Sequence, residues 1–206
     1  RTIDGDVRAL RDDMLVIADA TRPVAVAGVM GGADSEVGEG TKNILLESAW
    51  FEPSSVRRTA RALAMNTEAS QRFQRGADPE MTLYACNRAT RLIHECCGGQ
   101  VAHGILDVYP RPAAKRDVLL RFDRTNALLG TSMDANQQCS ILKRLAFDET
   151  ASSDASASFR VPSWRHDVTR EADLIEEIAR FYGYENIPAT VPRVRKTDTV
   201  LAPVEV

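Results

Sequence analysis

The stretch that most restricts the fold of this chain is residues 163–188, SWRHDVTREADLIEEIARFYGYENIP. It begins in a strand-like segment, continues as one amphipathic helix and ends in a turn. Thr169 or Asp167 can cap the helix N-terminus with a side-chain oxygen, and Gly183 can supply the left-handed residue after the last turn. Apolar side chains recur on one arc of the helix, at Leu174, Ile175, Ile178, Phe181 and Tyr182. This pattern predicts a helix that packs one face against a core.

Acidic side chains lie on roughly the opposite arc of the same helix. Asp173, Glu176 and Glu177 are spaced i, i+3 and i+4, and Asp167 precedes the helix. One interpretation is a solvated face, on which Glu176 and Arg180 form an i, i+4 ion pair. The other is a site for a hard cation such as Mg²⁺, which takes oxygen ligands and tolerates a partly hydrated site. The spacing alone leaves both interpretations open.

The bulk composition is that of a globular protein. The 206 residues are 44% hydrophobic and 27% charged, enough for one large or two small domains with proper cores. The net charge of −3 means that any contact with RNA must be local, because proteins that bind phosphates broadly carry a basic surplus. Four cysteines show no CxxC spacing, and the three histidines show no ligand spacing to them, so we expect reduced, mostly buried thiols and no zinc.

The sequence shows neither a membrane-spanning run nor a signal peptide. No apolar run approaches the roughly 18 residues that a transmembrane helix needs, and no charged and apolar leader opens the chain. We therefore expect a cytoplasmic protein without a membrane partner. Because the sequence starts at Arg1, inside a segment that is patterned like folded structure, we also expect it to be a piece of a longer protein.

The first half predicts strands and then helices. Strands are expected at 14–17, 24–29 and 43–51, helices from Pro53 to about Leu63 and from Asp78–Pro79 to Gly98–Gly99, and another strand at 101–109. Pro110 and Pro112 then mark a domain boundary. The glycine-rich loop at 28–40 lacks both GxGxxG spacing and a GK[ST] ending, so it is not a phosphate-binding loop. Its glycines either make a turn or admit a small ligand close to the backbone.

The second half predicts a different module. It begins with an expected strand at 118–122, followed by a helix that Asp123 caps and that ends at Gly130. Asp134 opens a second helix, in which Ile141, Leu142 and Leu145 face inward. A mobile polar hairpin loop at 149–158 and a strand at 159–161 then lead to the amphipathic helix. The order strand, helix, helix, strand, strand, helix fits a winged-helix-like α+β module. The residues after Pro188 show no periodicity and are expected to be a linker.

Four separated motifs resemble a single family. PSWRHDVTREADLIEEIARFYGYENIP is similar to the B5 domain of the bacterial phenylalanyl-tRNA synthetase beta subunit. GVMGGADSEV, ILLESAWFEPSSVRRTARAL and NTEASQRFQRGADP are similar, in that order, to the later part of its B3/B4 domain. The resemblance implies an α+β chain, with a partial, mixed α/β B3/B4 editing domain at 1–109, a winged-helix-like B5 domain at 110–190 and a linker at 191–206.

The resemblance also implies a function. The family attaches phenylalanine to its tRNA with ATP, and its B3/B4 domain hydrolyses tyrosine that has been attached by mistake. The expected partners are the alpha subunit, in a heterotetramer of two alpha and two beta subunits, and tRNA(Phe); the ATP site belongs to the alpha subunit. The editing site of the family also takes a histidine and an arginine from the part of B3/B4 that precedes Arg1, so we expect the isolated piece to be inactive. The alternative is a non-catalytic scaffold that docks protein or RNA.

The editing positions of the family match Gly31, Glu47, Thr67 and Ala69. Each has a structural alternative. Glu47, in an otherwise apolar strand, could pair with an arginine at position 57, 58 or 61. Thr67 could cap a helix, and Ala69 could simply pack.

The magnesium positions of the family match Asp167, Asp173, Glu176 and Glu177. The family's site is attributed jointly to the alpha and beta subunits. The resemblance thus favours the cation interpretation of the acidic arc, with Mg²⁺ as the cofactor.

Overall fold

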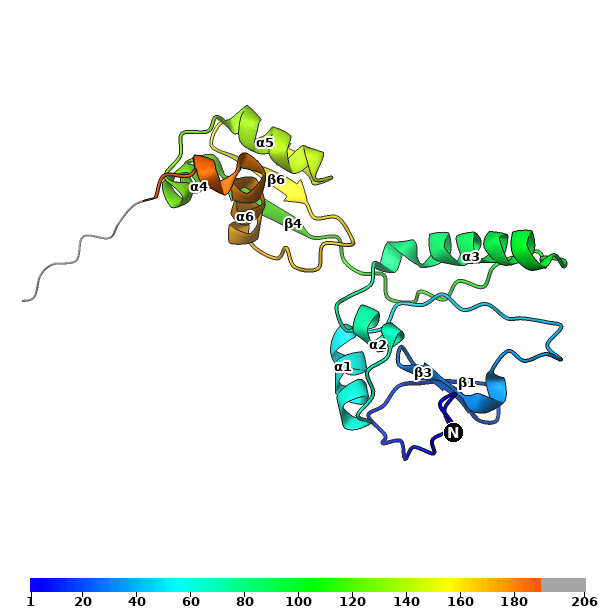
Figure 1. The fold of residues 1–206 in the computed structure, drawn as a ribbon. Helices are drawn as coiled ribbons and strands as arrows, with labels where there is room; N and C mark the ends of the chain where they lie inside the picture. The colour runs from blue at the N-terminus through cyan, green and yellow to red at the C-terminus, as the bar shows by residue number, and fades with distance from the viewer. Residues whose placement is uncertain (190–206) are drawn as a thin grey trace, which may run out of the picture. The chain divides into compact units, whose positions relative to one another are not determined.

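The computed structural model describes residues 1–189, so the linker expected at 191–206 lies outside the described residues. The chain divides into two units, residues 1–116 with 162–167, and residues 117–161 with those from 168 onward; each is described by itself (Figure 1). The first unit contains β1 (Val16–Ala18), β2 (Pro23–Val26), β3 (Met30–Gly31), η1 (Ala33–Ser35), α1 (Pro53–Ala62), α2 (Glu68–Phe73), η2 (Pro79–Met81) and α3 (Thr82–Cys97). The second unit contains β4 (Asp117–Arg121), α4 (Phe122–Leu129), α5 (Ala135–Arg144), β5 (Asp148–Ser152), β6 (Ser156–Arg160), α6 (Glu171–Tyr182) and η3 (Tyr184–Asn186). Helices together with small antiparallel sheets confirm the expected α+β class.

The sheet of the first unit is an antiparallel meander in the order β1-β2-β3. Val16 pairs with Val26, and Ala25 pairs with Gly31. Gly28 lies in the turn between β2 and β3 with a φ of +67°, which glycine adopts without strain. Of the two roles considered for the glycine-rich loop, Gly28 therefore serves the turn.

The core of the first unit forms between this turn and the first helix. Its buried members are Val26, Val29, Val56, Ala60 and Met65, with Met30, Phe51, Leu63 and Phe73 packed against them. A Cβ at position 28 would lie 3.0 Å from a ring carbon of Phe51 and 3.0 Å from a methyl of Val56. The glycine thus also lets the turn approach α1 closely.

Two strands expected in the first unit are absent from the described residues. Residues 43–51 and 101–109 are assigned to neither helix nor strand, and no backbone hydrogen bond of theirs reaches a neighbouring segment. Leu45 and Leu106 are each 96% exposed. The apolar pattern was that of strands, but a strand also needs a neighbouring edge to accept its backbone hydrogen bonds. These two predictions are wrong for the described part of the chain.

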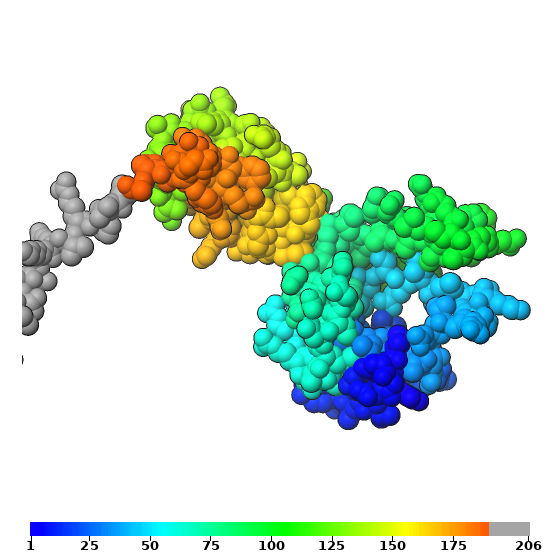
Figure 2. Space-filling model, viewed as in Figure 1, coloured from blue at the N-terminus to red at the C-terminus, as the bar shows by residue number. Residues whose placement is uncertain are grey.

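The long helix α3 forms where it was expected. Asp78 accepts a hydrogen bond from the backbone N–H of Glu80 at 3.0 Å in the short turn that leads into it. The helix ends at Gly98, as expected. It contains no buried residue, and its atoms (green) lie open on the face seen in Figure 2. Cys96 and Cys97 are therefore exposed; only Cys139 among the four free cysteines is buried, which corrects the expectation of mostly buried thiols.

The second unit follows the expected order of strand, two helices, two strands and helix. Its sheet is antiparallel in the order β4-β6-β5, and α6 packs against β4 and α5. The fully or almost fully buried side chains of its core are Leu120, Leu142, Phe147, Phe159, Val168, Leu174, Ile175 and Ile178. Ile141 and Leu142 are buried and Leu145 packs against the core, as predicted for α5. On α6, Phe181 departs from the predicted apolar arc and is 43% exposed.

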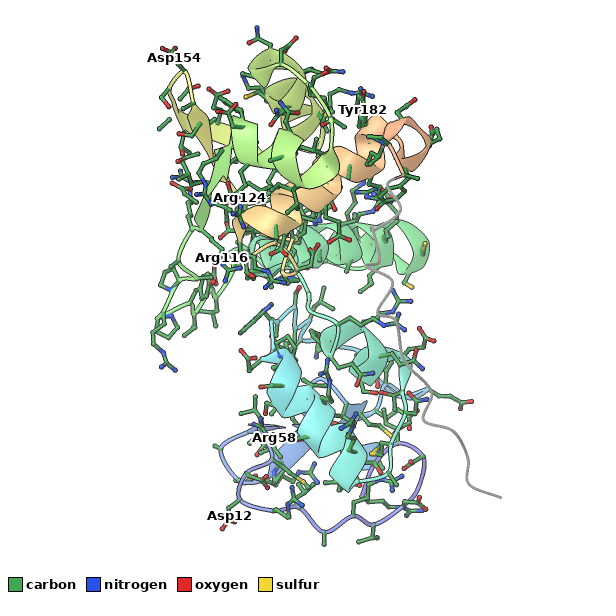
Figure 3. All side chains as sticks on the ribbon, turned by 90° about the vertical axis from the view of Figure 1, so that its left-hand side faces the viewer. Asp12, Arg58, Arg116, Arg124, Asp154 and Tyr182 are labelled. Carbon is green, nitrogen blue, oxygen red and sulfur yellow. The ribbon has the colours of Figure 1, made fainter. Side chains whose placement is uncertain are left out.

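The polar stretch at 149–158 is mostly strand, which corrects the expected mobile loop. Only residues 153–155 turn, and Asp154 lies at the tip of the β5–β6 hairpin (Figure 3). Glu149 pairs with Phe159 and Ser152 with Ala157 across the two strands. Small polar residues are stable here because β5 is an exposed edge strand, while β6 turns Ala157 and Phe159 into the core.

Helix capping in the second unit was predicted in part. Asp134 caps α5 by accepting a hydrogen bond from the backbone N–H of Gln137 at 2.7 Å. Asp123 does not cap α4 but lies in its first turn. The N-cap of α6 is Arg170, neither Thr169 nor Asp167. Gly183, with a φ of +96°, ends α6 as expected.

Candidate functional sites

A pocket of about 530 Å³ lies within the first unit. Its wall comes from β2, the following turn and β3, from the extended segment at 47–51, from α2 and from the start of α3. Most of the lining is apolar. Phe51 and Phe73 contribute two aromatic rings that meet edge to face, with centroids 5.0 Å apart.

Three of the four predicted editing residues line this pocket, although they are far apart in the sequence. Gly31 belongs to β3, Glu47 to the extended segment, and Ala69 to α2. A Cβ at position 31 would lie 2.8 Å from the terminal methyl of Ile3, so a larger residue here would have to displace that side chain. The fold therefore brings Gly31, Glu47 and Ala69 together around one space.

Glu47 presents a carboxylate that forms no hydrogen bond or ion pair with any residue in 1–189. The alternative pairings expected from the sequence do not form: Arg57 donates to the carbonyl of Gln74 at 3.0 Å, and Arg58 donates to the hydroxyl of Ser54 at 3.4 Å. Glu47 is exposed to solvent as a whole, but the protein beside its carboxyl displaces part of the surrounding water and raises the pKa of Glu47. A carboxylate in this position is available to accept a hydrogen bond from a ligand.

Thr67 lies behind the pocket wall. Its hydroxyl donates to the backbone carbonyl of Val29 at 2.7 Å and accepts from the backbone N–H of Ser70 at 3.0 Å. The hydroxyl of Ser70 in turn accepts from the backbone N–H of Thr67 at 2.9 Å, which completes a capping box. The expected cap is confirmed, and it also joins α2 to the turn after β2.

Residues that sequence reasoning missed also line the pocket. The most informative are Phe73 and Arg72, which follow Ala69 on α2 at i+4 and i+3. Side chains with this spacing share one face of a helix. Once Ala69 was assigned to a pocket, helical periodicity could have indicated both.

The four predicted magnesium ligands already have different surroundings. Asp167, in the first unit, pairs with the guanidinium of Arg165 through contacts of 2.9 and 2.6 Å. Asp173 accepts from the backbone N–H groups of Thr169 and Arg170 at 2.8 and 2.9 Å. Among residues 1–189 no group of three or more histidine, cysteine, aspartate or glutamate side chains is arranged to hold a metal ion. The described residues do not by themselves form the predicted site.

The other two predicted ligands lie on different sides of α6. Glu177 is 7% exposed and pairs with Arg180, so it does not lie on a solvated arc. This replaces the expected pair of Glu176 with Arg180. Glu176 is exposed.

A carboxylate that the sequence analysis did not single out holds the start of α6 to β4. Glu171 accepts from the guanidinium of Arg121 at 3.0 and 2.6 Å and from its backbone N–H at 2.9 Å. Arg124 adds an ion pair of 3.0 Å. The hydrogen bonds from Arg121 lower the pKa of Glu171 despite partial burial. Both arginines and the glutamate belong to the second unit, where they stabilise the joint between helix and sheet.

None of the helices in residues 1–189 is long and apolar enough to cross a bilayer.

Comparison with known proteins identifies both parts of the chain. Residues 1–98 match the model of the B3/4 domain, and residues 118–184 match that of the tRNA synthetase B5 domain. The phenylalanine–tRNA ligase beta subunit of Geobacter metallireducens is 47% identical over 194 residues, which is 94% of this chain and 24% of that protein. The beta subunit of Anaeromyxobacter dehalogenans is 50% identical over 191 residues (93% and 24%), and that of Salinibacter ruber is 48% identical over 187 residues (91% and 22%).

The chain thus spans about a quarter of the length of these curated relatives. The order of its two domains and the identity along nearly its whole length confirm the resemblance found in its motifs. The chain belongs to the family of phenylalanine–tRNA ligase beta subunits.

Proposed function

We propose that the chain is part of the beta subunit of an ATP-dependent phenylalanine–tRNA ligase and that its pocket removes tyrosine from mischarged tRNA(Phe). The observation that carries this proposal is the pocket around Gly31, Glu47 and Ala69, which combines aromatic walls with one unpaired carboxylate. Its volume of about 530 Å³ is ample for an aromatic amino acid.

The pocket would distinguish tyrosine from phenylalanine by the phenol. The Glu47 carboxylate accepts a hydrogen bond from the tyrosine hydroxyl, while the ring packs against Phe51 and Phe73. Phenylalanine has no hydroxyl, so its bound ring would shield the Glu47 carboxylate from water without giving it a hydrogen-bond partner. A site built in this way discriminates better than an apolar pocket, which rejects an added hydroxyl only about a hundredfold.

The proposed reaction is ester hydrolysis. Water adds to the ester carbonyl carbon, the bond from that carbon to the ribose oxygen breaks, and a proton from the water passes to the ribose oxygen. The products are free tyrosine and a tRNA with a free terminal hydroxyl. In line with the family resemblance, we propose that further groups at this site come from a part of B3/B4 outside this chain, so that the isolated piece is inactive.

The proposed setting is cytoplasmic, with the alpha subunit and tRNA(Phe) as partners in a heterotetramer of two alpha and two beta subunits, and with ATP bound by the alpha subunit. The proposed Mg²⁺ site takes oxygen ligands from both subunits. The separate partners of Asp167, Asp173 and Glu177 support a shared site, because among these four side chains, as described in residues 1–189, only Glu176 has no hydrogen bond or ion pair.

The test is Glu47→Ala in the assembled enzyme. We expect the preference for hydrolysing the tyrosyl ester over the phenylalanyl ester to fall by at least tenfold, about the effect of losing one hydrogen bond to a charged group. Aminoacylation with phenylalanine should be unchanged. Unchanged discrimination with lower thermal stability would show that Glu47 is structural.

A second candidate function is a scaffold that docks another chain. The exposed apolar side chains of α3, including Leu83, Tyr84 and Leu92, favour it. The same assay separates the two: a scaffold role alone predicts normal clearance of Tyr-tRNA(Phe) for variants of Glu47 and Ala69.

A further inference from the structure

The pocket of the first unit has a single cationic side chain among the described residues that line it. That residue is Arg72, which α2 presents on the same face as Ala69 and Phe73. The other charged lining residues are Glu47 and Asp78. Asp78 is already engaged as a cap, with its carboxylate 3.0 Å from the backbone nitrogen of Glu80.

Arg72 is held only weakly in its present position. Its guanidinium pairs with Glu68 at 3.1 Å, one helical turn earlier, and the two side chains are 79% and 82% exposed. Ion pairs this exposed contribute little to stability, because water screens them. The guanidinium can therefore exchange Glu68 for a ligand at small cost.

Within the described lining, the charge of the pocket conflicts with the substrate of the proposed function unless Arg72 offsets it. A tRNA carries its amino acid on a terminal adenosine, and a phosphodiester joins this adenosine to the preceding nucleotide. Two carboxylates line the pocket, and they would repel that phosphodiester. Guanidinium groups bind phosphate oxygens through two parallel hydrogen bonds, so an exposed arginine suits this position.

We propose that Arg72 binds the last phosphodiester of the tRNA and so places the ester in the pocket. The inference rests on the proposed editing function and deepens it. Arg72 is a positioning residue in this proposal, since it contacts the carrier rather than the ester. Glu47 and the aromatic rings of Phe51 and Phe73 bind the amino-acid side chain.

The experiment uses the assembled alpha–beta enzyme and two small esters. One is adenosine esterified with tyrosine, which has no phosphate; the other is the tyrosyl ester of the dinucleotide CpA, which adds one phosphodiester. Arg72→Gln should raise KM for the dinucleotide ester about five- to tenfold, leave kcat unchanged and leave hydrolysis of the adenosine ester unchanged. Arg72→Lys should recover part of the loss, because it keeps the charge but not the paired donors.

Arg75→Gln is the matched control. Arg75 is also exposed and lies just past the end of α2, but it does not line the pocket. Its substitution should leave the hydrolysis of both esters unchanged. With whole Tyr-tRNA(Phe), Arg72→Gln should also lower the salt dependence of binding by about 0.7 in the log–log slope, the value for one phosphate contact on a single strand.

The possible results distinguish a failure of this inference from a failure of the proposed editing function. If Arg72→Gln weakened hydrolysis of both esters equally, Arg72 would act on the amino acid or on the fold. If KM for the dinucleotide ester were unchanged, Arg72 would not bind the phosphate. Either result overturns the proposal. If Glu47→Ala leaves discrimination intact, the role of Glu47 in the proposed editing function fails on its own evidence, whatever Arg72 does. A wild-type enzyme that does not clear whole Tyr-tRNA(Phe) refutes both.

Discussion

Asp173→Ala should destabilise the second unit far more than Glu176→Ala, although both residues occupy predicted magnesium positions. The carboxylate of Asp173 accepts from two backbone N–H groups, at 2.8 Å from Thr169 and 2.9 Å from Arg170. These donors precede the first turn of α6, where a helix supplies no acceptor of its own. Losing a capping acceptor costs about 0.5–2 kcal/mol, and with two donors affected we expect about 1–2 kcal/mol.

Conservative and control variants sharpen this prediction. Asp173→Asn keeps one oxygen acceptor but loses the charge, so about half the effect should remain, since neutral acceptors bind backbone N–H groups about half as strongly. Glu176 is exposed and has no such role, so Glu176→Ala should stay within about 0.5 kcal/mol of wild type.

Native-state amide hydrogen exchange, read on peptides from β4, β6 and α6, measures the opening of this unit without interference from the other. Metal-free buffer isolates the structural role of Asp173. If Asp173→Ala opens these peptides no more readily than Glu176→Ala, the capping argument is refuted.

The pKa of Asp173 is lowered: partial burial opposes the shift, but the N–H groups of Thr169 and Arg170 outweigh it. The stabilisation should therefore be complete above pH 3.8, the ordinary aspartate pKa, and be lost as the pH falls through the lowered folded value.

Three further predictions concern the pocket, the joint between helix and sheet, and the metal. Ala69→Trp should abolish clearance of Tyr-tRNA(Phe) by the assembled enzyme while aminoacylation stays normal; clearance at the wild-type rate would show that position 69 does not face the substrate. Glu171→Gln should lower the unfolding free energy of the second unit by about 1 kcal/mol at pH 7, because it weakens charged hydrogen bonds to two arginines. The difference between wild type and Glu171→Gln should shrink below about pH 4.5, since the folded-state pKa is lowered and the interaction is lost as Glu171 protonates; a difference independent of pH would contradict this. Mg²⁺ should raise the melting temperature of the alpha–beta assembly more than that of the 206-residue chain, and the exposed Glu176→Gln should remove that difference; equal shifts in both, or none in either, would leave the acids of α6 with structural roles alone.

Local sequence signals predicted the elements of this chain well. The caps at Thr67 and Asp134 involve groups three residues apart, and the glycine ends of α3 and α6 depend on one residue each. The buried arc of α6 follows from the helical period. Such features depend on the neighbouring few residues, which the sequence displays directly.

The predictions that were wrong concern features that depend on partners far away in the sequence. Residues 43–51 have the pattern of a strand, but the described chain gives them no edge to pair with. Residues 149–158 have the composition of a loop, but their first part pairs as β5 with the edge of β6. Glu177 belongs to the polar arc of α6 by spacing, yet it is buried and pairs with Arg180. The pocket illustrates the same limit, because the meeting of Phe51 with Phe73 is a tertiary contact that no local pattern encodes.

Thr67 shows how the fold can control the pocket from outside it. The hydroxyl of Thr67 joins the N-terminus of α2 to the carbonyl of Val29, in the turn that Gly28 makes possible. The orientation of α2 decides where Ala69, Arg72 and Phe73 point, because all three project from one face of that short helix. A six-residue helix has little stability of its own, so its position depends on tertiary contacts such as this hydrogen bond and the packing of Phe73 against the core. A threonine that does not line the pocket therefore contributes to the placement of one of its walls through a hydrogen bond to the turn after β2.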